Sequence, residues 1–237
     1  HSFQRAMAGM TEYRMAGKDS FWTWRDLMYR FTANLTPEHI EAIAAFVFLE
    51  MQEAGYASVG EFHYLHHQAG GATYDDLGEL SSRIATAAAK TGIGLTHLPV
   101  LYTYGGAGQV PLEAGQARFG NSVDRFNDLV ARAQDVVAHL PADCQVGIAP
   151  HSLRATSPDD LKAVLAAHTA GPVHIHIAEQ PKEVADISAW LGARPVEWLQ
   201  ANADVTTNWC LIHATHMTAN ETLNMAKSGA VAGLCPV

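Results

Sequence analysis

A histidine and a glutamate three residues apart stand out in this sequence as a pair that could carry chemistry. Residues 173–180 read VHIHIAEQ, in which apolar residues alternate with two histidines, and this alternation predicts a short strand. His176 lies at the end of that strand, and Glu179 opens the loop to a helix that begins at Pro181. Such a histidine can bind a metal ion, and such a carboxylate can carry a proton beside it. A buried histidine bonded to backbone carbonyls, next to a glutamate that suits a helix N-terminus, would give the same pattern.

Two further histidines bear on the same site. His174 lies two residues before His176 and therefore on the same face of the expected strand. We favour His176 as the metal ligand because only it lies within one strand-end turn of Glu179, and we expect His174 to lie a layer deeper or to support the ligand. His213 ends a second strand-like run at residues 209–212, which predicts a place at the same end of the sheet.

The elements that would position these residues alternate regularly along the chain. Six strand-like runs are each, except the last, followed by a helical pattern, which predicts a parallel sheet covered by helices. The strand-like runs are 58–65, 94–102, 145–149, 173–177, 209–212 and 230–235. The expected helices cover 3–14, 21–31, 36–54, 76–91, 123–139, 157–168, 181–193, 195–200 and 219–227. A long Gly-rich loop, 103–121, is typical of a lid or of a subunit contact.

Polar residues gather where these strands end, namely Tyr64, His151, Arg154, His176, Glu179 and His213. In an α/β barrel the carboxyl ends of the strands line one mouth, which holds the active site. We therefore predict an α/β fold, a (β/α)8 barrel of TIM type, in which residues 1–237 form one partial domain with about six of the eight strands. A doubly wound open sheet is the alternative. It is less favoured because no Gly-rich phosphate loop follows a first strand and because the polar ends spread over several strands.

Composition and charge argue against several other classes of protein. The chain of 237 residues has a formal charge of −9, which argues against nucleic acid as a partner. No apolar run approaches the ~18 residues that a membrane span needs. Three widely spaced cysteines, Cys144, Cys210 and Cys235, are typical of reduced core thiols in a cytoplasmic protein. The chain begins at His1 without an initiator Met and stops directly after a strand-like run, so we expect a segment of a longer protein.

Most of the remaining candidates fit structural roles. The histidines of the helical runs, expected at surfaces or helix ends, are His39, His139 and His168. We expect His66 and His67 to be solvated in a polar loop, and His97 to be a hydrogen-bonded core residue. No lysine ends an expected strand, which disfavours a Schiff-base aldolase, and Ser152 lacks the G-x-S-x-G elbow of a serine hydrolase.

Several motifs resemble a known superfamily. The sequence HIAE at 176–179, His213 at the end of the next strand and His1 at the start of the segment resemble the deaminase branch of the amidohydrolase superfamily. Within that branch, similarity to the family of N-formimidoyl-L-glutamate deiminases runs across essentially the whole segment. The motifs that carry it are HSFQRAMAGMTEY, FWTWRDLMY, GEFHYLHH, PHSLRA and HIHIAEQ. HxxE alone is a weak signal, whereas these motifs together are a narrow signature.

The resemblance implies a role for each matching residue. His1 and His176 would bind one divalent metal ion, zinc or alternatively iron, Glu179 would shuttle the proton, and His213 would lie beside the metal-bound water. The residues that would hold the glutamate part of the substrate are Gln4, Arg25, Tyr64, His151 and Arg154. The family's other two metal ligands, a histidine and an aspartate, fall outside 1–237, as does its small β-domain. We therefore expect this segment by itself to bind metal poorly.

The resemblance also implies a reaction, the metal-dependent hydrolysis of N-formimidoyl-L-glutamate to N-formyl-L-glutamate and ammonia in histidine degradation, by a cytoplasmic homodimer. Arg25 and Arg154 suit a dicarboxylate because a guanidinium pairs with a carboxylate through two parallel hydrogen bonds. One alternative is another aminohydrolase of the superfamily that acts on a purine or pyrimidine ring, which would need aromatic stacking residues and no paired arginines. The other is a catalytically inactive barrel that binds a small dicarboxylate.

Overall fold

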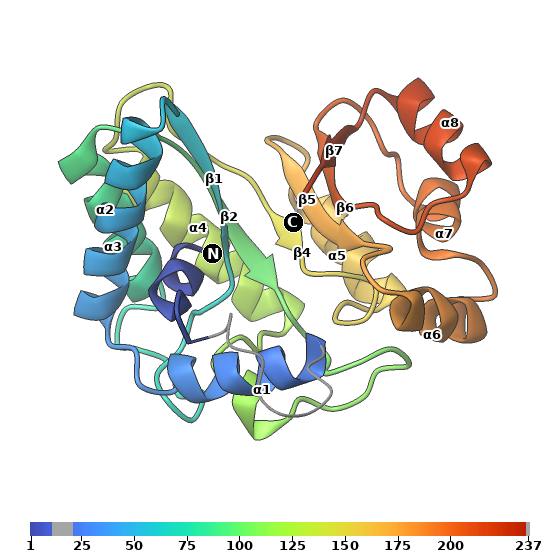
Figure 1. Ribbon diagram of the computed structural model, residues 1–237, viewed down its shortest axis with the longest axis horizontal. Helices are drawn as coiled ribbons and strands as arrows, with labels where there is room; N and C mark the ends of the chain where they lie inside the picture. Colours follow the sequence, from blue (N-terminus) through green and yellow to red (C-terminus); the bar gives the residue numbers. More distant parts are fainter. Residues whose placement is uncertain (11–20, 236–237) are drawn as a thin grey trace. The chain divides into compact units, whose positions relative to one another are not determined.

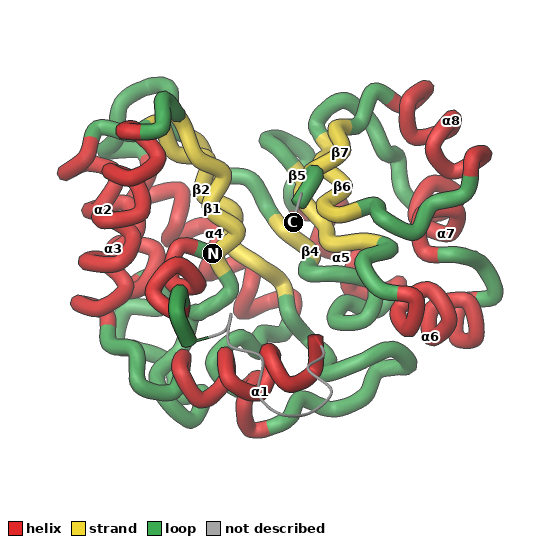
Figure 2. The backbone as a smooth tube through the Cα atoms, viewed as in Figure 1, coloured by secondary structure: helices red, strands yellow, loops and turns green. Residues whose placement is uncertain are grey.

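The computed structural model describes residues 1–10 and 21–235, and the chain divides into two compact units. Unit 1 comprises His1–His97, Glu113–Gly120 and Asp128–Val146. Unit 2 comprises Leu98–Leu112, Asn121–Asn127 and Gly147–Val237. Each unit contains strands flanked by helices, so both belong to the predicted α/β class (Figure 2).

Unit 1 is built on three strands. Strands β1 (Ser58–His63) and β3 (Gln145–Val146) both pair with β2 (Gly94–Leu101), whose first residues belong to this unit. The helical elements are η1 (Ser2–Met7), α1 (Phe21–Thr32), α2 (Pro37–Glu53), α3 (Glu79–Thr91), η2 (Ala114–Gln116) and most of α4 (Val123–Val137). Figure 1 shows α2 and α3 side by side, and they pack against each other. The helix predicted at 3–14 is present as the shorter 3-10 helix η1, and residues 11–14 lie outside the described residues.

The start of α2 is held by a pair of reciprocal hydrogen bonds. The backbone N–H of His39 donates to the Thr36 hydroxyl at 3.3 Å, and the backbone N–H of Thr36 donates to Nδ1 of His39 at 3.3 Å. This is a capping box in which histidine takes the place of the usual glutamate or glutamine. His39 is therefore a helix-start residue, as its position in the sequence predicts.

Unit 2 contains a run of parallel strands joined by helices. The elements are the end of β2, then β4 (Ala149–Pro150), α5 (Pro158–Ala167), β5 (Val173–Ile177), α6 (Pro181–Leu191), α7 (Pro195–Asn202), β6 (Trp209–His213), α8 (Ala219–Ser228) and β7 (Val231–Gly233). β5 pairs with β6 in parallel register, from Val173 opposite Trp209 to Ile177 opposite His213. β6 in turn pairs in parallel with β7. The neighbours therefore follow the order of the chain, as β/α alternation predicts.

The strand predicted at 145–149 is divided into β3 and β4, and Gly147 lies between them. A Cβ at this position would collide with the backbone oxygen of Pro172, so the close approach requires glycine. The backbone N–H of Ile148 donates to that oxygen at 3.0 Å, and the N–H of His174 donates to the Ile148 oxygen at 3.0 Å. These bonds join the segment before β4 to the start of β5 within unit 2.

The alternation predicted for β5 is confirmed. Val173, Ile175 and Ile177 are buried in the core, while His174 and His176 are only partly buried. The three cysteines are free thiols, as predicted, but the expectation that they lie in the core is wrong, because Cys144 and Cys210 are partly exposed and Cys235 is exposed. Among the described residues, no helix is both long enough and apolar enough to cross a membrane.

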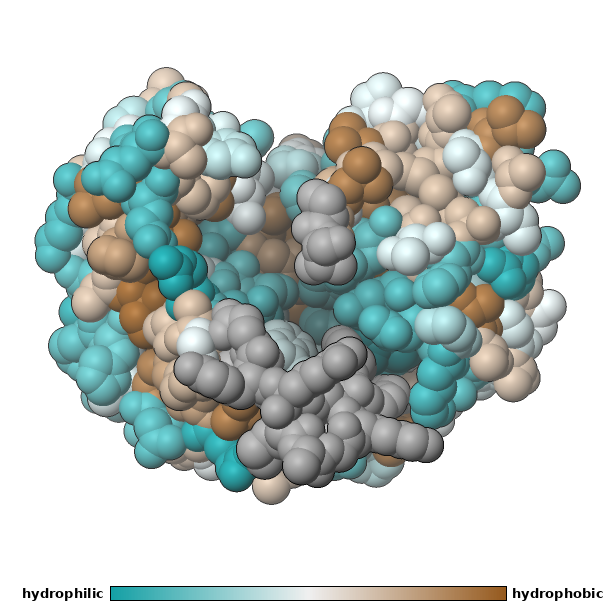
Figure 3. Space-filling model, viewed as in Figure 1, coloured by the Kyte–Doolittle hydropathy of each residue, from teal (hydrophilic) through white to brown (hydrophobic). Residues whose placement is uncertain are grey.

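Strand β7 forms the end of the sheet in unit 2, next to β6. Hydrophobic side chains gather at the surface over β7 (Figure 3). Val231 is 56% exposed and Leu234 is 75% exposed. Completion of the eightfold barrel by further strands stays a prediction.

Candidate active site

The site begins where β5 ends, at a turn with unusual backbone geometry. Ala178 follows the last residue of β5 and has a φ of 51°, in the left-handed region that a non-glycine residue rarely adopts. His213 and Ala214, at the end of β6, have φ values of 69° and 51°. The two turns are tied together, since the N–H of Ala214 donates to the Ile177 oxygen at 3.0 Å. Backbone strain of this kind gathers at functional sites, and here it marks two adjacent strand ends.

Three histidines lie together at these strand ends in unit 2, and we call them the unit 2 histidine cluster. The ring centroid of His176 lies 5.0 Å from that of His151 and 5.3 Å from that of His213. The backbone also joins them, because the N–H of His176 donates to the His151 oxygen at 3.0 Å. The strand-end residues that the sequence predicts within this unit are thus brought together. His174 lies on the same strand as His176 and is partly buried.

The environment keeps two rings of this cluster neutral near pH 7. Burial is the main cause that holds the pKa of His151 and of His176 well below the usual value of 6.5. The nearby guanidinium of Arg154 and the neighbouring imidazoles lower both pKa values further. A neutral imidazole is the form that binds a metal ion, so this environment suits the ligand role predicted for His176.

The carboxylate of Glu179 lies between a histidine and an arginine. Its Oε1 is 3.6 Å from Nε2 of His213, and its Oε2 is 3.7 Å from Nη2 of Arg154. Its side chain remains 16% exposed, so solvent and small molecules can reach it. A proton carrier needs such access together with fixed polar neighbours.

A second glutamate, which the sequence analysis missed, holds the turn that carries Glu179. The carboxylate of Glu183 accepts hydrogen bonds from the backbone N–H of Ala178 at 3.1 Å and of Glu179 at 3.0 Å. The residue is 2% exposed, and its Oε2 lies 4.0 Å from Nε of Arg154. Burial raises the pKa of Glu183. Its position in the sequence could have indicated this role, because a glutamate in the first turn after Pro181 can reach back to free backbone N–H groups.

Unit 1 holds the other predicted site residues, and three of them are in contact. Nδ1 of His1 lies 2.6 Å from the backbone oxygen of Phe62, which places the ring proton on Nδ1 and leaves the lone pair on Nε2. The ring of His1 packs edge-on against Tyr64, with centroids 4.4 Å apart. The amide of Gln4 donates to the Tyr64 hydroxyl at 3.3 Å.

The fourth predicted residue of unit 1, Arg25, has partners of its own. Its guanidinium lies 3.8 Å from the carboxylate of Glu113 and 5.5 Å from the ring centroid of Tyr29. The role of Arg25 in binding substrate stays a prediction.

A separate group of histidines in unit 1, here called the unit 1 histidine cluster, comprises His63, His66 and His97. The ring of His63 lies 5.4 Å from His66 and 5.1 Å from His97 between centroids. Nε2 of His97 is 3.0 Å from the Ser81 hydroxyl, which confirms the predicted hydrogen-bonded core histidine.

The expectation that His66 and His67 are solvated is wrong, because both are buried, at 1% and 0% exposed. Their backbone N–H groups donate to the Arg118 oxygen at 3.0 and 3.1 Å, and Nε2 of His67 is 3.1 Å from the Gly120 oxygen. The loop is thus folded against a distant part of unit 1.

The donor chemistry at both predicted ligands fits a divalent metal ion. His176 is a neutral ring at a strand end, and His1 presents Nε2 while Nδ1 bonds a backbone carbonyl, which is the arrangement that orients a ligating histidine. Within the described residues, no group of three or more His, Cys, Asp or Glu side chains is arranged to hold a metal ion. His1 belongs to unit 1 and His176 to unit 2, so their binding to one ion stays a prediction.

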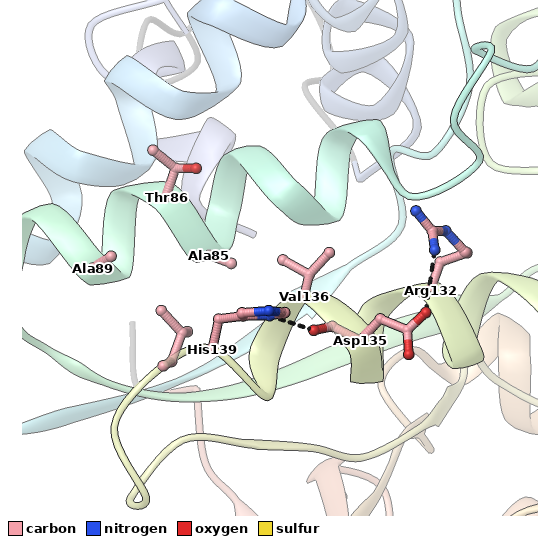
Figure 4. A pocket seen from close by; sticks show the side chains of 8 residues that line it. Ala85, Thr86, Ala89, Arg132, Asp135, Val136 and His139 are labelled. Carbon is pink, nitrogen blue, oxygen red and sulfur yellow. Dashed lines mark hydrogen bonds and ion pairs between the residues drawn. The ribbon is translucent and has the colours of Figure 1, made fainter.

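Grooves elsewhere contain none of these residues. One groove of about 480 Å³ lies between α3 and α4 of unit 1, where Arg132 and His139 both bond Asp135 (Figure 4). Another, of about 310 Å³, lies on unit 2 and is lined by residues that include Gln200, Asp204 and Asn224. Neither of these two grooves includes a predicted site residue, and the contacts at the strand ends alone define the candidate site.

Comparisons with known proteins show which family the chain belongs to. A model described as "Amidohydrolase family" matches residues 1–237. The formimidoylglutamate deiminase of Pseudomonas aeruginosa is 52% identical over 236 residues, which make up 99% of this chain and 52% of that protein. A crystal structure of an amidohydrolase from Brucella melitensis has a TM-score of 0.96 and 51% identity, over 100% of this chain and 52% of that chain.

A more distant structure, an adenosine deaminase from Xanthomonas campestris with bound zinc, has a TM-score of 0.71 and 21% identity, over 96% of this chain and 47% of that chain. At this identity the likeness shows the fold alone. The resemblance predicted from the motifs is confirmed by the family model and by the relative from Pseudomonas aeruginosa. The chain spans about half the length of the relatives it matches.

Proposed function

Because this chain belongs to the amidohydrolase family, we propose that the whole protein hydrolyses N-formimidoyl-L-glutamate to N-formyl-L-glutamate and ammonia. The observation that carries the proposal is the carboxylate of Glu179, which lies 3.6 Å from His213 and 3.7 Å from Arg154 at the strand ends of unit 2. The 52% identity to the formimidoylglutamate deiminase of Pseudomonas aeruginosa supports the choice of substrate.

A divalent metal ion, which we propose to be zinc bound by His176 and His1, would supply Lewis-acid activation of water at neutral pH. Glu179 takes a proton from the attacking water and delivers it to the departing nitrogen. The bond from oxygen to the formimidoyl carbon forms, the second proton of the attacking oxygen then passes to the same nitrogen, the bond from that carbon to its terminal nitrogen breaks, and ammonia leaves. His213 hydrogen-bonds the attacking oxygen from beside Glu179 and stabilises the charge that develops there.

The two arginines bind the carboxylates of the substrate. Arg154 is 15% exposed, so its guanidinium can exchange the long contact with Glu179 for a shorter pair with a ligand carboxylate. Gln4, Tyr64 and His151 complete the contacts to the glutamate part. The hydrogen bond between Gln4 and Tyr64 fixes the orientation of the Gln4 amide and of the Tyr64 hydroxyl.

We extend the proposal to the architecture around the site. Parallel strands that follow the chain order in unit 2 support a (β/α)8 barrel, to which the rest of the protein would add the missing strands. The rest of the protein would also add the family's remaining metal ligands. We propose that the complete enzyme acts as a homodimer in the cytoplasm, with no nucleic acid or membrane as partner.

The test is an assay of ammonia release from N-formimidoyl-L-glutamate by the full-length protein. Glu179→Gln keeps the shape of the side chain and removes the proton carrier, so we expect kcat to fall by about 10²- to 10⁴-fold. Zinc content, measured by mass spectrometry, should stay at the level of the unmodified protein. Glu197→Gln, at an exposed position on α7, is the control and should leave kcat unchanged.

Three results would contradict the proposal. Undiminished turnover by the Glu179→Gln protein would remove Glu179 from the mechanism. Ammonia release that survives complete removal of metal by a chelator would remove the metal. Release of ammonia from a purine or pyrimidine ring, and not from the formimidoyl substrate, would favour the ring aminohydrolase.

A further inference from the structure

The buried carboxylate of Glu183 makes contacts that a helix start does not require. A glutamate at the third position of a helix usually bonds the N–H of the N-cap residue. In α6 the N-cap is Gln180, yet Glu183 bonds the N–H groups of the two residues before it, Ala178 at 3.1 Å and Glu179 at 3.0 Å. Its two oxygens are therefore committed to the turn that carries the proposed proton carrier.

That turn would not hold its shape by local preference alone. Ala178 has a φ of 51°, a left-handed conformation that is unfavourable for a residue with a Cβ. Two hydrogen bonds to a carboxylate, each stronger than a bond to a neutral acceptor, can maintain this conformation. Glu183 is also 4.0 Å from Arg154, the same residue that lies 3.7 Å from Glu179.

A second glutamate of unit 2 provides the matched comparison. Glu221 occupies the third position of α8, is 4% exposed and lies 3.0 Å from Nε of Arg194. It bonds the N–H of its own N-cap, Thr218, at 2.7 Å, which is the usual capping box. Glu221 is thus buried, lies at the same helix position and has an arginine partner, like Glu183. It differs from Glu183 because it bonds the N–H of its own N-cap residue and not those of the two residues before the N-cap.

We propose that Glu183 is a positioning residue, which fixes the backbone of Ala178 and Glu179 and so aims the Glu179 carboxylate at the reacting atoms. This role rests on the proposed function, because it gives Glu179 the part of proton carrier. Glu183 acts through this turn and does not itself touch the substrate.

The first test compares Glu183→Gln with Glu221→Gln in the full-length protein. An amide side chain can accept from one N–H but presents its NH₂ group to the other, so the turn loses one of its two bonds. We expect kcat to fall at least tenfold in Glu183→Gln, with KM for N-formimidoyl-L-glutamate changed less than threefold. Glu221→Gln should leave kcat unchanged. An equal loss of kcat in both variants, or a rise in KM alone for Glu183→Gln, would overturn the proposal.

A second substitution separates positioning from simple relief of strain. Glycine adopts a positive φ without the penalty that alanine has, so Ala178→Gly should recover thermal stability in the Glu183→Gln background. It should not recover kcat, because the glycine leaves the direction of Glu179 less restricted. Full recovery of kcat by Ala178→Gly would mean that Glu183 only compensates strain.

Amide hydrogen exchange tests the same geometry without turnover. The N–H groups of Ala178 and Glu179 should exchange at least tenfold faster in Glu183→Gln than in the unmodified protein, and should not change in Glu221→Gln. Unchanged exchange in Glu183→Gln would refute the positioning role even if the enzyme is active. If the unmodified protein releases no ammonia while the exchange rates change as expected, the proposed substrate fails and the hold of Glu183 on the turn stands.

Discussion

Each unit of this protein contains a group of histidine rings in contact, and the surroundings of the two groups differ. In the unit 1 histidine cluster all three residues are buried, and His97 bonds the uncharged hydroxyl of Ser81. In the unit 2 histidine cluster the residues remain partly exposed, and His213 lies 3.6 Å from the carboxylate of Glu179. A group of imidazoles becomes a candidate site when charged groups and solvent can reach it, and contact between the rings is not enough.

Depressed pKa values do not separate the two clusters. Burial lowers the pKa of His97 to about 4, and burial also lowers those of His63, His151 and His176. The same physical cause therefore keeps a structural histidine and a proposed ligand neutral. The difference lies in the backbone nearby, since His176 lies beside the strained turn at Ala178, whereas no residue next to His63 or His97 has a positive φ.

Removing one histidine from each cluster should give the largest contrast. His176→Asn should abolish zinc binding in the full-length protein and lower kcat/KM by at least about 10³-fold, because one of the proposed metal ligands is lost. His63→Asn should retain zinc, and should instead lower the free energy of unfolding by about 1–3 kcal/mol as a buried packing change. Metal analysis and urea unfolding of both variants measure the two effects. Loss of zinc in His63→Asn would erase the distinction between the clusters.

The unit 1 histidine cluster should make the free energy of unfolding sensitive to acid. The folded protein protonates His97 at a pKa of about 4, against a value of 6.5 for an exposed histidine. As pH falls from 6.5 to 4, the unfolded state binds a proton that the folded state does not, so this residue lowers stability over that window. A difference of about 2.5 pH units corresponds to about 3 kcal/mol.

Urea unfolding of the full-length protein between pH 7 and pH 4 measures this contribution. His97→Gln should flatten the fall in unfolding free energy relative to the unmodified protein. His139→Gln is the control, because His139 is exposed at the end of α4. Parallel profiles for the unmodified protein and His97→Gln would show that His97 is not held neutral by burial.

The sequence was sufficient for the parts of this comparison that local patterns determine. Alternation at 173–177 predicted β5, and the polar strand ends together with the motifs predicted the grouping of His151, His176 and His213. The burial of His66 could not be predicted, because its N–H bonds Arg118, a residue far along the chain.

Two further features depend on tertiary contacts. Gly147, where the third strand is divided, approaches Pro172 closely, and local preference does not encode this contact. Glu183 was overlooked because a glutamate in a first helical turn is ordinary, and only the fold shows that its carboxylate is buried against the turn before the helix.

A smaller effect should separate the arginine of the unit 2 site from a structural arginine in the same unit. Arg154→Met removes the guanidinium that we propose to pair with a substrate carboxylate, and a charged hydrogen bond of about 1.5–3 kcal/mol corresponds to a rise in KM of roughly 10- to 100-fold. Arg194→Met, which breaks the pair with Glu221, should lower stability and leave KM unchanged. Steady-state kinetics with N-formimidoyl-L-glutamate measures both. A ring substrate has no carboxylate for Arg154 to bind. Unchanged KM in Arg154→Met would therefore shift the assignment toward a ring aminohydrolase. It would also mean that the charged neighbour Arg154 does not distinguish the unit 2 histidine cluster from the unit 1 histidine cluster.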